Sequence, residues 1–255
     1  MPSLLTSHER QSDPFEGIRI LGWVKTSLLD YPGKVASTLF FEGCNLRCPY
    51  CHNPDLVVSS RSGNEDLVDP GEVLSYLETY RRMLEGVCIT GGEPLLQPGL
   101  PALCDAIRTL GLQVKVDTNG SLPDALGRLV QERLVNYVAV DIKGPPGKIR
   151  AITGSRVSEE SLIQSVEATV RLLQGSGLPY ELRTTVVPGL LEREDLLAIG
   201  RWLQNGAKYV LQQFRPGRTL DPDLRTLRPH PPEYLRELSR ELAGYFAECT
   251  VRGLG

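Results

Sequence analysis

Three cysteines fall within eight residues of one another in the first quarter of the chain. Cys44, Cys48 and Cys51 have the spacing C-x3-C-x2-C. Three thiolates on one short loop can bind three irons of a [4Fe-4S] cluster. The fourth iron then has no protein ligand, and an open coordination position on a metal is what catalysis requires. The spacing therefore predicts a catalytic iron–sulfur centre.

Four other interpretations of these cysteines stay open from the residues alone. Cys48 and Cys51 form a C-x2-C dithiol of the kind that alternates with a disulfide. Followed by His52, they also match the attachment site of c-type haem, although that attachment normally needs export. Cys44, Cys48, Cys51 and His52 could hold structural zinc, although an adjacent Cys and His are awkward ligands for one tetrahedron. Three inert, buried thiols are the plainest alternative.

The composition limits the class of protein. The chain has 255 residues, with 28 Lys plus Arg against 31 Asp plus Glu and a formal net charge of −3. This near-neutral balance argues against a general nucleic-acid binder and against binding to anionic membranes. No apolar run is long enough to cross a bilayer, and residues 1–15 lack the apolar core of a signal peptide. We therefore expect a cytoplasmic protein with reduced thiols, in which clustered cysteines serve metal or redox chemistry.

Further polar clusters stand where predicted strands end. They are Gly91-Gly92-Glu93, Asp117-Thr118-Asn119-Gly120 and Asp141-Ile142-Lys143. The cysteines follow the strand predicted at 35–41 in the same way. Because the carboxyl ends of parallel strands meet at one edge of a sheet, where ligands bind in α/β folds, we expect all these residues to face one mouth.

Strand and helix patterns alternate along the chain from about residue 35. Strands are predicted at 35–41, 87–90, 114–116, 137–140, 180–187 and 209–214. Amphipathic helices are predicted after an N-cap at Asp69, at 101–110, at 123–134, from Ser158 to a stop at Gly175, at 192–204 and around 235–245. The alternation implies βαβ units and a parallel sheet, and a partial barrel or an open doubly wound sheet would satisfy it. Residues 1–16 are expected to be a flexible tail, and 17–255 a single domain ending in a helix.

The cysteine motif, with Tyr50 directly before its third cysteine, resembles that of the radical S-adenosylmethionine (SAM) enzymes. The segment Gly91-Gly92-Glu93-Pro94 resembles the Gly-Gly-Glu segment of that family. Blocks that resemble the glycyl-radical-enzyme activases are Asp117-Thr118-Asn119-Gly120, Asp141-Ile142-Lys143 and Arg183–Gly189. The run Lys25–Gly33 is most similar to the anaerobic ribonucleotide reductase activating proteins. The resemblance covers about residues 18–215 and implies a partial (β/α)6 barrel of the radical SAM type.

The resemblance implies that Cys44, Cys48 and Cys51 hold a [4Fe-4S] cluster whose open iron binds SAM. Reductive cleavage of SAM then releases methionine and a 5′-deoxyadenosyl radical, which abstracts hydrogen from the substrate. The residues implied at SAM are Tyr50 beside the adenine, Gly91 and Gly92 at the methionine end, Glu93 at the ammonium group, Asp117, Lys143 at the carboxylate, and Arg183. Glycine would allow a close backbone approach, and a carboxylate would accept from the ammonium group.

A cation site is also implied by the resemblance. Asp117, Thr118 and Asp141 resemble a site of this kind in the activases, which adds a monovalent cation to the expected cofactors. The structural alternative for Asp117, Asp141 and Lys143 is a salt bridge across the strand ends. Arg183 could equally be the buried partner of a carboxylate.

The chain departs from the activases at two places. No cysteine lies between Cys51 and Cys88, so an inserted ferredoxin-like module with a second cluster is not expected. Formate-lyase activases have a histidine near the sixth strand that helps hold SAM. The corresponding region here is Leu211-Gln212-Gln213-Phe214-Arg215-Pro216, in which Gln212, Gln213 and Arg215 are the available replacements. Cys88 and Cys104 fall in apolar patterns and are expected to be buried, inert thiols.

Three functions follow, from different classes. The first is a radical SAM activating enzyme that abstracts a Gly hydrogen from a partner glycyl radical enzyme. Its expected partner is anaerobic ribonucleoside-triphosphate reductase, and its expected electron donor is a flavodoxin or a ferredoxin-type protein. The second is a radical SAM enzyme acting on a small molecule, similar to carboxy-deazaguanine synthase. The third is an iron–sulfur electron carrier, which usually supplies a fourth cluster ligand that the cysteine loop lacks. The activase-like blocks favour the first.

Overall fold

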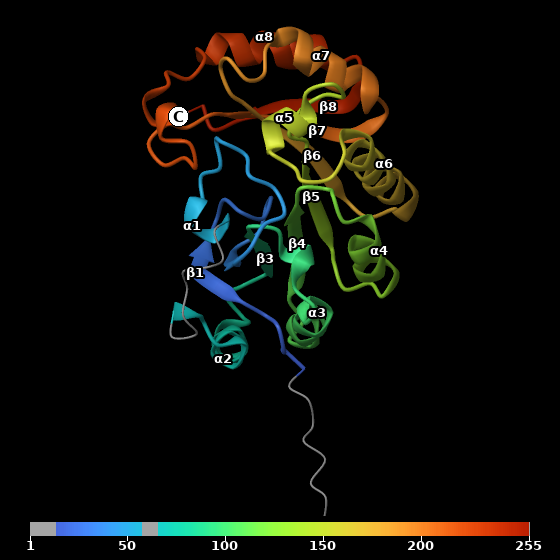
Figure 1. Cartoon of the computed structure of the whole chain (residues 1–255). Coiled ribbons are helices and arrows are strands. Elements are labelled where there is room, and N and C mark those ends of the chain that lie inside the picture. Colours follow the sequence, from blue (N-terminus) through green and yellow to red (C-terminus); the bar gives the residue numbers. More distant parts are fainter. Residues whose placement is uncertain (1–13, 58–65, 255) are drawn as a thin grey trace, which may run out of the picture.

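Eight strands form one sheet in which each strand pairs with its neighbours in chain order (Figure 1). The computed structural model describes residues 14–57 and 66–254. The strands are β1 (Ile20–Ser27), β2 (Ala36–Phe41), β3 (Gly86–Gly91), β4 (Gln113–Thr118), β5 (Tyr137–Asp141), β6 (Tyr180–Val186), β7 (Gly206–Gln213) and β8 (Phe246–Arg252). β1 is antiparallel to β2, and every later pair is parallel. The predicted α/β fold with a parallel sheet is therefore confirmed.

Two edge strands, β1 and β8, extend the six predicted strands to eight. β1 contains Gly22 and then places Trp23, Val24 and Lys25 in succession, without the strict alternation that marks a half-buried strand. β8 follows the last helix, so the described chain does not end in the helix that was predicted. Within residues 14–57 and 66–254, β1 and β8 do not pair with each other, and the barrel is open between them.

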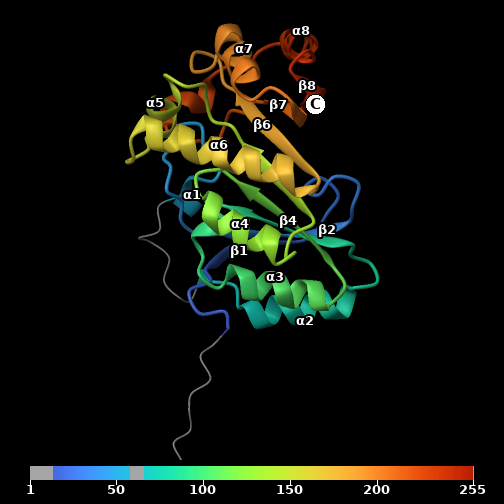
Figure 2. The same ribbon diagram turned by 90° about the vertical axis from the view of Figure 1, so that its right-hand side faces the viewer.

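The helices cover one face of the sheet. Figure 1 shows α3, α4 and α6 on one side of the strands, and the view from that side in Figure 2 shows α2 beside α3. The helices are α1 (Pro54–Val57), α2 (Pro70–Tyr80), α3 (Leu100–Thr109), α4 (Pro123–Gln131), α5 (Ile149–Thr153), α6 (Glu159–Ser176), α7 (Arg193–Trp202) and α8 (Pro232–Leu242), with 3-10 helices η2 (Pro94–Leu96) and η3 (Pro222–Thr226). None of the helices in the described part of the chain is long and apolar enough to cross a lipid bilayer.

Local signals set the helix ends, with one correction. The Asp69 carboxylate accepts a hydrogen bond from the Glu72 amide at 3.0 Å and caps α2 as predicted. α6 does not stop at Gly175, because Gly175 keeps a helical backbone and the helix continues to Ser176. Gly177 ends it with a φ of +69°, a left-handed conformation that glycine adopts without strain. Either Gly175 or Gly177 could end the helix, and the left-handed backbone of Gly177 shows that the helix ends there.

Each central strand has an apolar face and a polar face. The apolar face packs with the helices and includes the fully buried side chains of Leu39, Val87, Ile89, Val114, Val116, Val138 and Val140. The alternate positions carry Thr38, Cys88, Lys115, Asp117, Asp141, Glu181 and Arg183. Because successive side chains of a strand point to opposite faces, these polar groups line the interior of the partial barrel.

The folded domain begins earlier than predicted. Of the tail expected at 1–16, residues 1–13 lie outside the described residues. Residues 14–17 form a turn, and the Ile18 amide donates to the Phe15 carbonyl at 3.0 Å. Phe15 packs against the main hydrophobic core. The described domain therefore includes the last residues assigned to the tail.

A buried ion pair joins the unpredicted strand β8 to β6. The Arg252 guanidinium donates to both carboxylate oxygens of Glu181, at 2.9 Å each, and the Glu181 side chain is fully buried. Arg252→Met leaves that carboxylate with the Tyr137 hydroxyl, which donates to it at 3.2 Å, and with Arg183 at 4.0 Å. Because Arg252 itself is partly exposed, we expect the free energy of unfolding to fall by about 2 kcal/mol in urea denaturation.

The matched control for Arg252→Met is Lys208→Met, on the neighbouring strand. Lys208 pairs with Glu248 at 2.9 Å, and both side chains are partly exposed. The loss expected from this control is below about 1 kcal/mol. Equal losses from the two variants would contradict a stabilising role for the Arg252–Glu181 pair.

Candidate functional site

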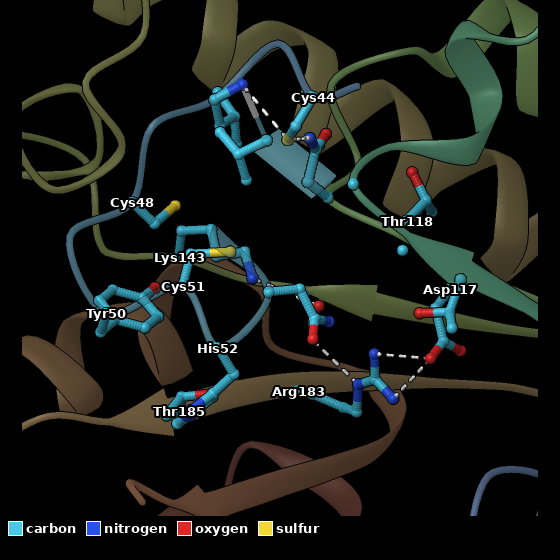
Figure 3. A pocket seen from close by; sticks show the side chains of 18 of the residues that line it. Cys44, Cys48, Tyr50, Cys51, His52, Asp117, Thr118, Lys143, Arg183 and Thr185 are labelled. Carbon is cyan, nitrogen blue, oxygen red and sulfur yellow. Dashed lines mark hydrogen bonds and ion pairs between the residues drawn. The ribbon is translucent and has the colours of Figure 1, made fainter. Parts of the chain in front are cut away.

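The polar clusters that follow the strands meet in one cavity of about 320 Å³ at the carboxyl ends of β2 to β7. The predicted residues that line it are Cys44, Cys48, Tyr50, Cys51, Gly91, Gly92, Asp117, Thr118, Asp141, Lys143 and Arg183. Figure 3 shows Cys48 and Cys51 beside Lys143, with Asp117 and Arg183 farther along the wall. Glu93, also predicted here, lies behind the lining and is fully buried.

The cysteine loop takes its shape from segments that are distant in sequence. Apolar side chains of residues 46–50 pack in a second hydrophobic cluster with residues that follow β6 and β7. The Arg47 amide donates to the Thr153 carbonyl in α5 at 2.7 Å. The Asp221 amide, from the segment after β7, donates to the Pro49 carbonyl at 2.8 Å. The loop is therefore held on both sides by tertiary contacts.

Gly91 and Gly92 are required by a close backbone approach. A Cβ atom on Gly92 would lie 1.9 Å from the Gly43 carbonyl oxygen, and one on Gly91 would lie 2.2 Å from the Phe41 amide nitrogen. The Gly92 amide donates to the Phe41 carbonyl at 2.9 Å. Because Gly91 and Gly92 lack side chains, the backbone that leads into Cys44 can pass close to them. The resemblance had implied that these two glycines allow a close approach to SAM.

Glu93 supports the loop that follows β4. One carboxylate oxygen accepts from the Thr118 hydroxyl at 2.9 Å and from the Leu95 amide at 3.2 Å. The other oxygen accepts from the Asn119 amide at 2.7 Å. The Asn119 side chain in turn donates to Asn45 Oδ1 in the cysteine loop at 2.9 Å. Burial raises the pKa of Glu93 to about 7, although these three hydrogen bonds favour the ionised form.

Five alternating charges cross the interior of the barrel at the strand ends, and we call them the charge row. Arg183 Nε donates to Asp141 Oδ1 at 2.9 Å, and both terminal guanidinium nitrogens lie 3.3 Å from Asp117 Oδ2. Lys115 contacts Asp117 Oδ1 at one end of the row. At the other end, Lys143 Nζ lies 3.3 Å from Asp141 Oδ2. The ion pairs that were the alternative to ligand binding are therefore present.

The charge row stabilises its own ionised forms. Burial alone would raise the pKa of Asp141, but the nearby Arg183 and Lys143 outweigh it and hold that pKa below its usual range. Burial would lower the pKa of Lys143, and the Asp141 carboxylate raises it instead. The Lys143 ammonium also lies 5.9 Å from the centre of the Tyr50 ring. Both groups are therefore charged at neutral pH before any ligand arrives.

The site also contains residues outside the predicted set. Asp30, Thr185 and Gln212 line the cavity, and the buried Lys115 side chain contacts Asp117. Lys115 and Thr185 could have been found from the sequence, because each lies two residues from a predicted site residue on the same strand. Gln212 stands among the three replacements considered for the missing histidine. Asp30 lies in the loop between β1 and β2. Because β1 was not predicted, no sequence pattern placed this loop at the cavity.

Burial disfavours the thiolate forms of two of the three loop cysteines. Burial raises the pKa of Cys48 to about 12, and burial also raises the pKa of Cys44. All six cysteines are free thiols, and Cys88 and Cys104 are fully buried as expected. Iron would supply the positive charge that stabilises the thiolates, and binding would release their protons.

The donor set fits an iron–sulfur cluster. Three thiols line the same cavity. Such an arrangement suits a cluster, in which each thiolate binds a separate iron, better than it suits structural zinc.

Comparison with known sequences agrees with the resemblance to radical SAM enzymes. The sequence profile of the radical SAM superfamily matches residues 38–202. A protein of Methanocaldococcus jannaschii, named as a candidate glycyl-radical enzyme activating enzyme, is 30% identical over 235 residues, covering 91% of this chain and 95% of the relative. The pyruvate formate-lyase-activating enzyme of Staphylococcus epidermidis is 32% identical over 187 residues, covering 69% of this chain and 72% of that enzyme.

Solved structures share the fold. Streptococcus suis SuiB bound to S-adenosylmethionine superposes with a TM-score of 0.60 at 13% identity, covering 81% of this chain and 48% of SuiB. TYW1 with a lysine-pyruvate adduct superposes with a TM-score of 0.55 at 15% identity, covering 82% of this chain and 73% of TYW1. This chain thus spans about half the length of SuiB.

Gly92→Ala tests the close approach of the cysteine loop. The added methyl group would meet the Gly43 carbonyl, so the loop that carries Cys44 has to move. We expect a loss of about 1–3 kcal/mol in the free energy of unfolding and loss of most of the iron bound after anaerobic reconstitution. Gly244→Ala is the control, because its Cβ meets nothing within 4 Å. Full iron loading of Gly92→Ala would show that the contact does not position the thiols.

Glu93 makes stability depend on pH. Its pKa is raised from 4.5 to about 7, so the folded protein holds a proton that the unfolded chain releases. The contribution of Glu93 to the free energy of unfolding is present in full below its pKa in the unfolded chain. It is lost as the pH rises through its pKa in the folded protein. For cluster-free protein, we expect the Glu93 contribution to fall by about 3 kcal/mol between about pH 5 and pH 8. Urea denaturation of Glu93→Gln should show a flatter pH profile, and parallel profiles would contradict the assignment.

Proposed function

Because this chain belongs to the radical SAM superfamily, we propose that it installs a glycyl radical in a partner enzyme. The proposed partner is an anaerobic ribonucleoside-triphosphate reductase. The observation that carries the proposal is the match to the Methanocaldococcus jannaschii protein over 91% of this chain, which includes the cysteine loop and every strand end of the cavity.

The chain's own residues would divide the work inside one cavity. Cys44, Cys48 and Cys51 would hold the [4Fe-4S] cluster that the superfamily requires. When bound, the cluster and SAM supply a 5′-deoxyadenosyl radical, formed as one electron cleaves the sulfonium bond. Lys143 would donate to the carboxylate of SAM, because its ammonium group lines the cavity next to the thiols.

Other contacts to SAM come from the remaining strand ends. Tyr50 would pack beside the adenine, and the buried ring is already held by the second hydrophobic cluster. Thr185 and Gln212 line the cavity at the ends of β6 and β7. They would donate or accept hydrogen bonds where relatives use a histidine. Asp117 and Arg183 lie deeper and keep the charge row in place.

A protein glycine suits the space that is available. The cavity of about 320 Å³ is at the small end for ligand sites, and SAM would fill much of it. A glycine presents its Cα hydrogen without a side chain, so an extended loop of a partner could bring it close to SAM. The electron would come from a flavodoxin or a ferredoxin-type protein.

A second candidate is chemistry on a small molecule. The 7-carboxy-7-deazaguanine synthase of Methanopyrus kandleri is 36% identical over 135 residues. The match covers 45% of this chain and 52% of that enzyme, whereas the match to the Methanocaldococcus jannaschii protein covers 91% of this chain. We therefore rank it second, and the same experiment separates the two.

Anaerobic reconstitution tests the proposed function. Chain loaded with iron and sulfide is reduced, mixed with SAM and an anaerobic ribonucleoside-triphosphate reductase, and examined by electron paramagnetic resonance. We expect a glycyl radical signal on the reductase and about one 5′-deoxyadenosine for each radical formed. Cys48→Ala should abolish both signals, because one iron loses its thiolate. Cys104→Ala is the control, since Cys104 is buried in the core away from the cavity.

Two results would distinguish the alternatives. SAM cleavage without a glycyl signal, in the presence of the reductase and of a pyruvate formate-lyase, would remove the activase proposal and favour a small-molecule substrate. Bound iron without any SAM binding would instead support an electron carrier. A reductase variant with its radical glycine changed to alanine controls for signals that arise elsewhere.

A further inference from the structure

Every carboxylate oxygen of the charge row already faces a cation supplied by the chain. Asp117 Oδ1 contacts Lys115, and Asp117 Oδ2 lies 3.3 Å from two nitrogens of Arg183. Asp141 Oδ1 accepts from Arg183 at 2.9 Å, and Asp141 Oδ2 lies 3.3 Å from Lys143. Three cationic side chains therefore serve two carboxylates, and the row carries a net charge of about +1 at neutral pH.

The contacts around Asp117 are the most buried part of the charge row. The side chain of Lys115 is 2% exposed, that of Arg183 is 12% exposed and that of Asp117 is 14% exposed. A solvent cation at Asp117 would have to displace Lys115 or Arg183, and separating a buried ion pair is costly.

The remaining member of the expected cation site is also engaged. The Thr118 hydroxyl donates to the buried carboxylate of Glu93 at 2.9 Å. Its oxygen accepts from the Gly120 amide at 3.2 Å. Asp117, Thr118 and Asp141 are thus close together, but their oxygens are bonded to the protein.

We propose that Lys115 and Arg183 take the place of the monovalent cation expected at Asp117 and Asp141. Lys115 is then a positioning residue that acts through Asp117 and keeps the charge row, and with it Lys143, in place for the carboxylate of SAM. The chain accordingly binds SAM without a monovalent cation. This inference concerns the SAM pocket alone, so a failure to form a glycyl radical would leave it unaffected.

The wild-type holoenzyme provides the first test, with Rb⁺ as the probe. Equilibrium dialysis of radioactive Rb⁺ in tetramethylammonium chloride should show no saturable binding. The dissociation constant for SAM should be the same in sodium, potassium and tetramethylammonium chloride at equal ionic strength. Saturable Rb⁺ binding that tightens SAM binding would overturn the proposal, and this test requires no variant to fold.

Lys115→Met provides the second test. It frees Asp117 Oδ1 and lowers the charge of the row by one unit. We expect SAM to bind about tenfold more weakly in tetramethylammonium chloride, with recovery in sodium or potassium chloride and saturable Rb⁺ binding. A purely structural lysine would weaken SAM binding equally in all three salts, and that result would overturn the role of Lys115.

Two controls complete the series. Lys115→Arg keeps a cation beside Asp117, and its SAM binding should not depend on the choice of salt, whatever its affinity for SAM. Lys208→Met removes one positive charge from the β7–β8 surface and leaves the cavity lining unchanged. It should behave as the wild type. Salt-specific SAM binding by Lys115→Arg would argue against substitution of the cation by a side chain.

Discussion

The carbonyl of Gly43 occupies the place where a side chain at position 92 would stand, and the geometry of the site depends on this contact. It brings the loop after β2 against the loop after β3, and the Glu93 amide donates to the same carbonyl at 2.7 Å. The Glu93 carboxylate then holds the Asn119 amide, and the Asn119 side chain reaches Asn45. Three strand ends are thereby joined around the cysteine loop, which could not happen if the glycines carried side chains.

The second constraint is electrostatic. Ionised side chains are costly inside a protein unless each has a partner, and the interior of this sheet holds several. Direct contacts satisfy that requirement. Arg183 lies between Asp117 and Asp141, and Arg252 pairs with Glu181. The apolar face of the same strands packs with the helices and stabilises the sheet. The sheet thus has apolar packing on one face and paired, fixed charges on the other, and fixed charge needs little reorganisation when a ligand binds.

The thiols contrast with the charge row. The carboxylates and cations are ionised and paired before any cofactor arrives, whereas burial keeps Cys44 and Cys48 in their neutral forms. Their ionisation therefore waits for iron, and loading of the cluster is coupled to proton release. The loop that carries them is held in position by α5 and by the segment after β7. The proposed SAM pocket is thus charged before any ligand binds, whereas Cys44 and Cys48 become charged when iron binds.

Sequence alone determined the alternation of strands and helices, the parallel sheet, and the residues that gather at its carboxyl edge. Those features depend on local periodicity and on the spacing of Cys44, Cys48 and Cys51, which a linear reading can follow. Tertiary structure decided the edge strands β1 and β8, the role of Gly92 as a contact for Gly43, and the pairing of Lys115 with Asp117. The edge strands and the Gly92 contact depend on atoms that are far apart in the chain. Lys115 and Asp117 are only two residues apart, and their pairing depends on the burial of the strand face that they share. The role of a lysine in an apolar strand becomes clear only when the fold shows which carboxylate it contacts. The energy of an ion pair depends on the distance between the charges and on their burial, not on sequence order.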